Sequence, residues 1–274
     1  MTLPTSPYSF SLLLLVLILS SAFFLTTASE SKAEDEYSYT EGSSTGPENW
    51  GNINPKWKVC GDGKSQSPID FSDEKVQESL NLGELQKEYK PAHAVLKNRG
   101  HDIMIQWEGD AGELNINGTS YKLSQIHWHT PSEHTLHGSK FDLELHAVHQ
   151  NSKGEIAVIG VWYQIGQADP LLSKLLKYIK SIGDDDIDLG EVNPADINFG
   201  RKYYRYVGSL TTPPCTEGVI WTVMNKVSTV SKEQHSALIA AVHHGFEKNA
   251  RPTQELNGRQ VWFYNPKEPQ EEST

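Results

Sequence analysis

Two segments, 121-YKLSQIHWH-129 and 141-FDLELHAVH-149, decide how this chain folds. Both alternate apolar with polar residues and are rich in β-branched and aromatic side chains, a pattern typical of β-strands. The residues between them, 130-TPSEHTLHGSK-140, include proline, glycine and serine and predict a turn. Antiparallel pairing is the simplest arrangement for two strands joined in this way, so we expect the segments to lie side by side.

Three histidines on these strands have the spacing for a shared metal site. Side chains two positions apart on a strand point to the same face, so His127 and His129 face the same way, together with Gln125. The expected pairing can bring His146 beside them, with Glu144 on the same face. Three neutral imidazoles favour a catalytic zinc ion, which leaves a fourth position for water. Spacing alone leaves the alternative open that these are ordinary surface or core histidines.

The rest of the chain predicts a sheet with few helices. Further strands are expected at 103-IMIQW-107, 156-IAVIGVWYQI-165 and 219-VIWTVM-224. Two helices are expected, over 169-DPLLSKLLKYIKSI-182 and 231-SKEQHSALIAAVHH-244. Asp169 and Ser231 have the right positions to cap them, and Gly245 is expected to end the second. Many strands with two modest helices indicate an α+β domain.

The N-terminus predicts a secreted protein. The apolar run 11-SLLLLVLILSSAFFL-25 is short for a membrane span and precedes small residues, so residues 1–28 read as a signal peptide cleaved after Ala28. No Lys or Arg precedes the run, so an uncleaved anchor is the alternative. After cleavage no membrane span is expected. The acidic residues 29–38 predict a flexible arm, and 267–274 a polar tail.

Charge and cysteine content also fit a secreted protein. The net charge of −11 disfavours nucleic acid as a partner, because phosphates need basic side chains. The only two cysteines, Cys60 and Cys215, most simply form one disulfide in an oxidising compartment, with two buried thiols as the alternative. Asn117 begins the sequence Asn-Gly-Thr, a glycosylation acceptor expected in a turn.

Several short motifs match those of one known family. In order, they are 46-GPENWG-51, 65-SQSPID-70, 127-HWH-129, 132-SEHT-135, 143-LELHAVH-149 and 208-GSLTTPPCTEGVIW-221. Through them the chain resembles the α-class carbonic anhydrases, and in particular their secreted plant members, from Tyr39 to Tyr264. The resemblance implies a single domain at residues 39–266. It is expected to hold a large, mostly antiparallel twisted sheet, a few short helices, and zinc at the bottom of a conical cleft.

The resemblance also implies an activity, the reversible hydration of carbon dioxide to bicarbonate and a proton. Zinc would be held by His127, His129 and His146 and would carry the hydroxide that attacks carbon dioxide. Thr211 would accept a hydrogen bond from that hydroxide and donate one to an ionised Glu133. Without the resemblance, Thr211 and Glu133 would pass as ordinary residues of the chain.

Other residues would support the metal ligands. Those expected to accept the second ring N–H of His127, His146 and His129 are, respectively, Gln125, Glu144 and the main-chain carbonyl of Asn249. The strand pattern places Gln125 and Glu144 on the histidine faces independently of the resemblance. His134 and His149 are expected to be buried structural histidines.

Turnover also needs an exit for the proton and a place for the substrate. His101 lies where fast members of the family carry a proton shuttle, and the ordinary pKa of histidine suits that role. Asn98 and Tyr39 match residues that order the intervening water. The resemblance implies a carbon dioxide pocket formed by Val148, Val158, Leu210, Thr212 and Trp221.

The resemblance carries further expectations. Cys60 and Cys215 match the disulfide of secreted members, and Ser67-Pro68 and Pro213-Pro214 match cis peptide bonds. The compartment expected is extracellular or apoplastic, with the chloroplast reached through the secretory route as the alternative. The sequence does not indicate an oligomeric state.

Two other functions compete with this one. The main alternative is a storage or binding protein of low activity, because some relatives, plant tuber storage proteins among them, keep the fold without the function. All three ligand histidines, Glu133 and Thr211 are present here, which favours the enzyme. A zinc esterase or peptidase has little support, since the chain has no H-E-x-x-H segment.

Overall fold

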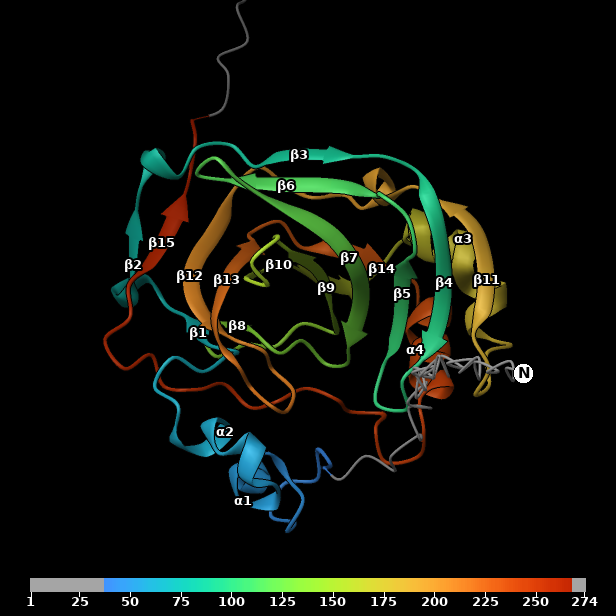
Figure 1. The fold of residues 1–274 in the computed structure, drawn as a ribbon, viewed down its shortest axis with the longest axis horizontal. Helices are drawn as coiled ribbons and strands as arrows, with labels where there is room; N and C mark the ends of the chain where they lie inside the picture. The colour runs from blue at the N-terminus through green and yellow to red at the C-terminus, as the bar shows by residue number, and fades with distance from the viewer. Residues whose placement is uncertain (1–36, 268–274) are drawn as a thin grey trace, which may run out of the picture. The chain divides into compact units, whose positions relative to one another are not determined.

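A single large β-sheet dominates the computed structural model, which describes residues 37–267 (Figure 1). The predicted signal peptide, residues 1–28, lies outside the described residues, as does most of the predicted arm and tail. Among residues 37–267, no helix has the length and apolar character needed to cross a membrane.

The main sheet has thirteen strands, and most neighbours in it are antiparallel. Its central path runs β11 (Ile187–Val192), β4 (Ala92–Asn98), β5 (Ile103–Trp107), β7 (Thr119–His129), β9 (Leu143–Gln150), β10 (Ile156–Ile165), β13 (Glu217–Met224), β12 (Tyr203–Ser209), β15 (Val261–Tyr264) and β2 (Val76–Glu78). Off this path, β14 (Ser228–Val230) pairs with β10, and β3 (Gln86–Tyr89) pairs with β6 (Gly112–Ile116), which also pairs with β7. A separate parallel pair joins β1 (Asp70–Phe71) to β8 (Thr135–Leu136).

The predicted strands are confirmed. β5 and β10 have the expected bounds, while β7, β9 and β13 contain nearly all of the segments predicted for them. β7 and β9 are antiparallel neighbours, as expected, and their register places His127 directly opposite His146. A register shift between Leu123 and Gln125 leaves the alternation from Gln125 to His129 intact. The two predicted histidine faces are therefore one face of the sheet.

Both predicted helices are present with the expected caps. In α3 (Pro170–Ile179) the Asp169 side chain accepts a hydrogen bond from Leu172 N, and in α4 (Lys232–Ala241) the Ser231 side chain accepts one from Gln234 N.

The end of α4 differs from the prediction. The helix stops at Ala241 rather than near Gly245, because Val242 is extended. At this end the Asn98 amide donates to Ala241 O at 2.8 Å, and His243 N donates to Gly100 O at 2.8 Å. Contacts with the β4–β5 turn thus replace a further helical turn.

A few short helices were expected from the resemblance, but their positions were not predicted. α1 (Trp50–Ile53) and α2 (Val59–Asp62) have four residues each, too few to show a helical period. Single 3₁₀ turns lie at Pro47–Asn49, Pro55–Trp57, Asp73–Lys75, Leu80–Leu82 and Pro194–Asp196. The sheet therefore carries the fold, and the helices cover parts of it.

The predicted covalent and turn features are also present. Cys60 in α2 and Cys215 after β12 form the expected disulfide, with Cα atoms 5.1 Å apart. The bonds Ser67-Pro68 and Pro213-Pro214 are cis as expected, and Thr130-Pro131 is a third cis bond that was not predicted. Asn117 is exposed in the turn between β6 and β7 and has φ 50°, so the acceptor site lies in a turn as predicted.

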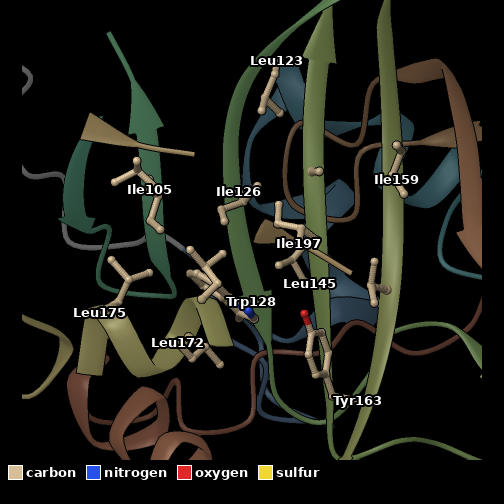
Figure 2. Close-up of a cluster of buried hydrophobic side chains, with 14 of the residues drawn as sticks. Ile105, Leu123, Ile126, Trp128, Leu145, Ile159, Tyr163, Leu172, Leu175 and Ile197 are labelled. Atoms are coloured by element: carbon tan, nitrogen blue, oxygen red, sulfur yellow. The ribbon is translucent and has the colours of Figure 1, made fainter. Parts of the chain in front are cut away.

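Apolar side chains fill both faces of the sheet. On one face, Trp128 and Leu145 from β7 and β9 pack with Leu172 and Leu175 of α3 (Figure 2). On the other face, a second apolar cluster contains Phe71, Val158, Trp162, Tyr206 and Trp221. The ligand histidines alternate with the first set along β7 and β9, so they project to the face of the second cluster.

Helix α3 should stabilise the sheet mainly through its buried leucines. We expect Leu172→Ala to lower the free energy of unfolding by about 2–5 kcal/mol, because it leaves a cavity against the sheet. The control is Lys174→Ala on the same helix, which removes only an exposed ion pair with Asp196 and should cost less than about 1 kcal/mol. Urea unfolding measures both. Equal losses would contradict this account of the core.

Candidate metal centre

The three predicted ligands meet on one face of the sheet. His127, His129 and His146 are nearly or fully buried, at 8 %, 0 % and 1 % exposure. Their ring centroids are 4.6–5.2 Å apart, and one nitrogen of each lies within 4.8 Å of the others. The β7–β9 register produces this convergence, because it sets His146 opposite His127.

Hydrogen bonds determine which nitrogen of each ring is available. The partners are those expected: His127 Nδ1 lies 2.8 Å from Gln125 Oε1, His129 Nδ1 2.7 Å from Asn249 O, and His146 Nε2 2.9 Å from Glu144 Oε1. Each partner atom is an acceptor, so each of these ring nitrogens carries the proton. The lone pairs therefore lie on His127 Nε2, His129 Nε2 and His146 Nδ1.

The lone pairs face a further acceptor, the Glu133 carboxylate. Glu133 Oε2 lies 3.6 Å from His129 Nε2 and 3.9 Å from His146 Nδ1. Glu133 Oε2 and His129 Nε2 are buried and have no hydrogen-bond partner. Buried acceptors without donors are unfavourable, and a cation bound by the three nitrogens removes that cost. The residues present therefore fit a zinc ion, whose usual ligands include three histidine nitrogens.

Burial keeps the ligand rings neutral. Removal from water lowers the pKa of His127 well below its ordinary value, and it lowers the pKa of His129 as well. A neutral imidazole has the lone pair that a metal needs, so these rings can bind a cation at neutral pH without first losing a proton.

The Glu144 carboxylate is the main organising group behind the ligands. Its Oε1 accepts from His134 and His146, and its Oε2 accepts from the main-chain N–H groups of Glu133 and His134. Burial alone would raise the pKa of Glu144, but these interactions with the two histidines outweigh it and lower the pKa. An ionised Glu144 thus fixes the ring of His146.

His134 and His149 are buried structural residues, as expected. His134 Nδ1 donates to Glu144 Oε1 at 2.7 Å, and its Nε2 lies 2.7 Å from the hydroxyl of Tyr206. Both of its nitrogens are engaged, so the group formed by His134, Glu144 and His146 is a hydrogen-bond network rather than a second metal site. His149 lies on the opposite face of β9, where Tyr89 O–H meets its Nε2 at 2.7 Å.

One expected hydrogen bond is not formed. Glu133 Oε1 accepts from Arg251 N at 2.9 Å, but Oε2 has no partner, so the bond predicted from Thr211 is absent. Glu133 Oε2 lies beside His129 Nε2 instead. Thr211 itself is buried, as the predicted role requires.

The residues of the predicted proton path lie near one another. His101 is in the β4–β5 turn with its side chain 14 % exposed. Tyr39 is buried, its hydroxyl has no hydrogen-bond partner, and its interactions with Glu133 and Asp102 contribute to a raised pKa after the larger effect of burial. The Asn98 side chain contacts main-chain groups, Ala241 O and Gly100 N, and its role in ordering water stays a prediction.

Four of the five predicted pocket residues belong to the second apolar cluster. These are Val148, Val158, Leu210 and Trp221. The Trp221 ring lies 4.8 Å from the His146 ring, so the cluster reaches the metal ligands. The fifth residue, Thr212, accepts a hydrogen bond from Cys215 N through its main-chain carbonyl at 2.8 Å. The conical cleft stays a prediction.

Sequence reasoning missed the buried Arg251. Its guanidinium donates to Gln66 Oε1, Ser67 O and Cys60 O, and its main-chain N–H holds Glu133. It therefore links the disulfide region to the carboxylate beside the ligands. No spacing signal marks an arginine that binds main-chain carbonyls so far away in sequence.

Fold and site together define a protein with a buried cluster of three histidines, able to hold a metal ion, on a mostly antiparallel sheet. A model of the eukaryotic-type carbonic anhydrase family matches residues 45–265, and the chain belongs to that family of enzymes. It is 53 % identical to alpha carbonic anhydrase 4 of Arabidopsis thaliana over 87 % of this chain and 89 % of that protein. It is 44 % identical to dioscorin dioA3 of Dioscorea japonica over 93 % of this chain and 96 % of the relative.

Solved structures agree with the fold. A dioscorin in complex with ascorbate superposes with a TM-score of 0.84 at 43 % identity, over 86 % of this chain and all (100 %) of the other. A hyperthermostable carbonic anhydrase from a hydrothermal vent chimney superposes with a TM-score of 0.76 at 35 % identity, over 84 % and 100 %. The predicted family and fold class are therefore confirmed.

His149 should make stability depend on pH. Burial lowers its pKa from 6.5 to about 4, so in mildly acidic solution the unfolded chain binds a proton that the folded chain excludes. The contribution of His149 to stability is complete above its pKa in the unfolded chain. It is lost as the pH falls toward its pKa in the folded protein. Within that window we expect the free energy of unfolding to decrease by about 1.4 kcal/mol per pH unit on account of this residue.

Urea unfolding of the wild type and His149→Gln at several pH values measures the effect. The variant should show a shallower decrease, because glutamine does not titrate. Gln150→Ala, which changes an exposed residue of the same strand that does not titrate, is the matched control and should leave the slope unchanged. Identical slopes for the wild type and His149→Gln would contradict the assignment.

Proposed function

We propose that this protein catalyses the zinc-dependent reversible hydration of carbon dioxide. The observation that carries the proposal is the meeting of three buried imidazole lone pairs beside an unpaired carboxylate oxygen. Membership of the carbonic anhydrase family supports the same activity. Relatives named dioscorin are about as similar as several carbonic anhydrases, so overall similarity does not choose between enzyme and storage protein. The presence of all three ligand histidines together with Glu133 and Thr211 supports the enzyme.

Zinc would be held by His127 Nε2, His129 Nε2 and His146 Nδ1. Carbonic anhydrases are the usual example of what the ion supplies, a coordinated water with a lowered pKa that serves as a nucleophile at neutral pH. The protein's own part is to keep the rings fixed. Gln125 and Glu144 do this for two of the rings through hydrogen bonds to the opposite nitrogen.

Other residues orient the reactants. The Thr211 hydroxyl would accept a hydrogen bond from the nucleophile and donate one to the ionised Glu133 at Oε2, which has no other hydrogen-bond partner. The apolar cluster beside Trp221 would hold carbon dioxide, a substrate with no net charge. His101 would carry the released proton from the site to buffer.

We also propose that the protein is made in the secretory pathway. The disulfide between Cys60 and Cys215 suits an oxidising compartment, and exposed Asn117 is accessible for a glycan. The predicted signal peptide supports the same route. The choice between apoplast and chloroplast stays open.

Removal of one ligand tests the metal and the activity together. We expect the purified mature protein to hold roughly one zinc per chain by elemental analysis and to hydrate carbon dioxide in a stopped-flow assay. His127→Ala should lose both, because two imidazoles remain for the ion. His93→Ala is the control and should keep both. Zinc-loaded wild type without hydration activity would favour the storage or binding alternative.

Thr211 tests the orientation of the nucleophile. Thr211→Val keeps the size of the side chain but removes the hydroxyl, and we expect kcat/KM to fall by about 10²-fold with the zinc content unchanged. Thr211→Ser keeps a hydroxyl and should retain most of the activity. Full activity in Thr211→Val would show that the hydroxyl has no such role.

A further inference from the structure

A fully buried carboxylate lies next to the predicted proton shuttle. Asp102 follows His101 in the β4–β5 turn, and its side chain is 0 % exposed. The Arg99 guanidinium donates to both of its oxygens, with Nε 2.7 Å from Oδ1 and Nη2 bonded to Oδ2. Such a bidentate pair is rigid, and neither residue has a part in the function proposed above.

The main chain of this turn is held without the Asp102 side chain. Arg99 N donates to Asp102 O at 3.0 Å, and Gly100 O accepts from His243 N at 2.8 Å. The Asn249 amide donates to His101 O at 2.7 Å. The turn conformation is therefore fixed by these contacts, and the Arg99–Asp102 pair is not needed to form it.

The carboxylate instead faces the His101 ring. Asp102 Oδ2 lies 3.7 Å from His101 Nε2, too far for a hydrogen bond but close enough for attraction between charges. The same ring also contacts the aromatic rings of Tyr37 and Phe246, at centroid distances of 5.7 and 6.3 Å. The His101 ring thus has a fixed negative charge and two aromatic side chains as neighbours.

Arg99 keeps the Asp102 carboxylate ionised. Burial alone would raise the pKa of Asp102, but the charge and hydrogen bonds of the Arg99 guanidinium help to lower it far below its ordinary range. The carboxylate therefore presents a negative charge at a fixed position beside the His101 ring.

We propose that Asp102, held by Arg99, is a positioning residue that keeps the His101 ring in place for proton transfer. This inference rests on the proposed function. Proton transfer needs a donor and acceptor at a defined separation, so a shuttle ring that turned away from the site would pass its proton more slowly. Burying an ion pair costs free energy of desolvation, and other hydrogen bonds already fix this turn. The proximity of Asp102 to the His101 ring gives the buried pair a role.

The test separates the proton-transfer step from carbon dioxide hydration. In weak buffer we expect Asp102→Asn to lower kcat by about three- to tenfold and to leave kcat/KM within about twofold of wild type. Added imidazole should restore kcat, because it replaces the shuttle. His101→Ala should behave in the same way and sets the size of the full effect. A loss that imidazole does not restore would indicate general damage and would overturn the inference.

Two further variants guard against a folding defect. Arg99→Gln combined with Asp102→Asn removes both charges at once, so no unpaired charge is left buried, and it should show the same loss and rescue. Asp186→Asn is the matched control, because it removes a carboxylate that is paired with Lys97 of β4. This variant should leave kcat unchanged. Crystals of zinc-free Asp102→Asn should show the His101 ring displaced from Tyr37 and Phe246.

The possible failures are distinguishable. A wild type that holds zinc but does not hydrate carbon dioxide would overturn the proposed function. An active wild type whose kcat is unchanged by Asp102→Asn would overturn only the positioning role. The same holds if His101 keeps its place in the crystals of the variant.

Discussion

The pairing register between β7 and β9 is the constraint on which the metal centre depends. With His127 directly opposite His146, the two rings lie on the same face with their centroids 5.2 Å apart. A slip of one residue would turn His146 to the opposite face, against the core that Leu145 now fills. The apolar alternation of the strands therefore selects the register, and the register in turn places the ligands. The packing of the core and the placement of the three histidines thus depend on the same few residues.

Hydrogen bonding then decides what the assembled rings can do. Each ligand ring gives its N–H to a fixed acceptor, so the remaining nitrogen has to present a lone pair. Glu144 illustrates how completely this arrangement is satisfied, because four donors meet its two oxygens. Glu133 differs, because its Oε2 has no hydrogen-bond partner and lies 3.6 Å from His129 Nε2. Glu144 thus supports the rings from behind, whereas Glu133 faces their lone pairs.

The sequence predicted those parts of the structure that follow from local pattern. Strand alternation placed Gln125, His127 and His146 on one face, and the capping residues Asp169 and Ser231 located both helices. It could not predict that Arg251 donates to carbonyls as distant in sequence as Cys60 O, because contacts to main-chain atoms do not depend on the partner's side chain. The positions of the two four-residue helices could not be predicted for a related reason, since a single turn has no period to recognise. The early end of α4 is set by its tertiary contact with the β4–β5 turn, which no helix signal contains.

Asn249 bonds to the end of β7 and to the β4–β5 turn. It lies in an irregular segment, yet its main-chain carbonyl orients the His129 ring while its side chain grips the carbonyl of His101. A displacement of this segment would therefore disturb the His129 ring and the main chain at His101 at once. The predicted metal ligand and the predicted proton shuttle are in this way mechanically coupled through a single asparagine that belongs to no strand or helix.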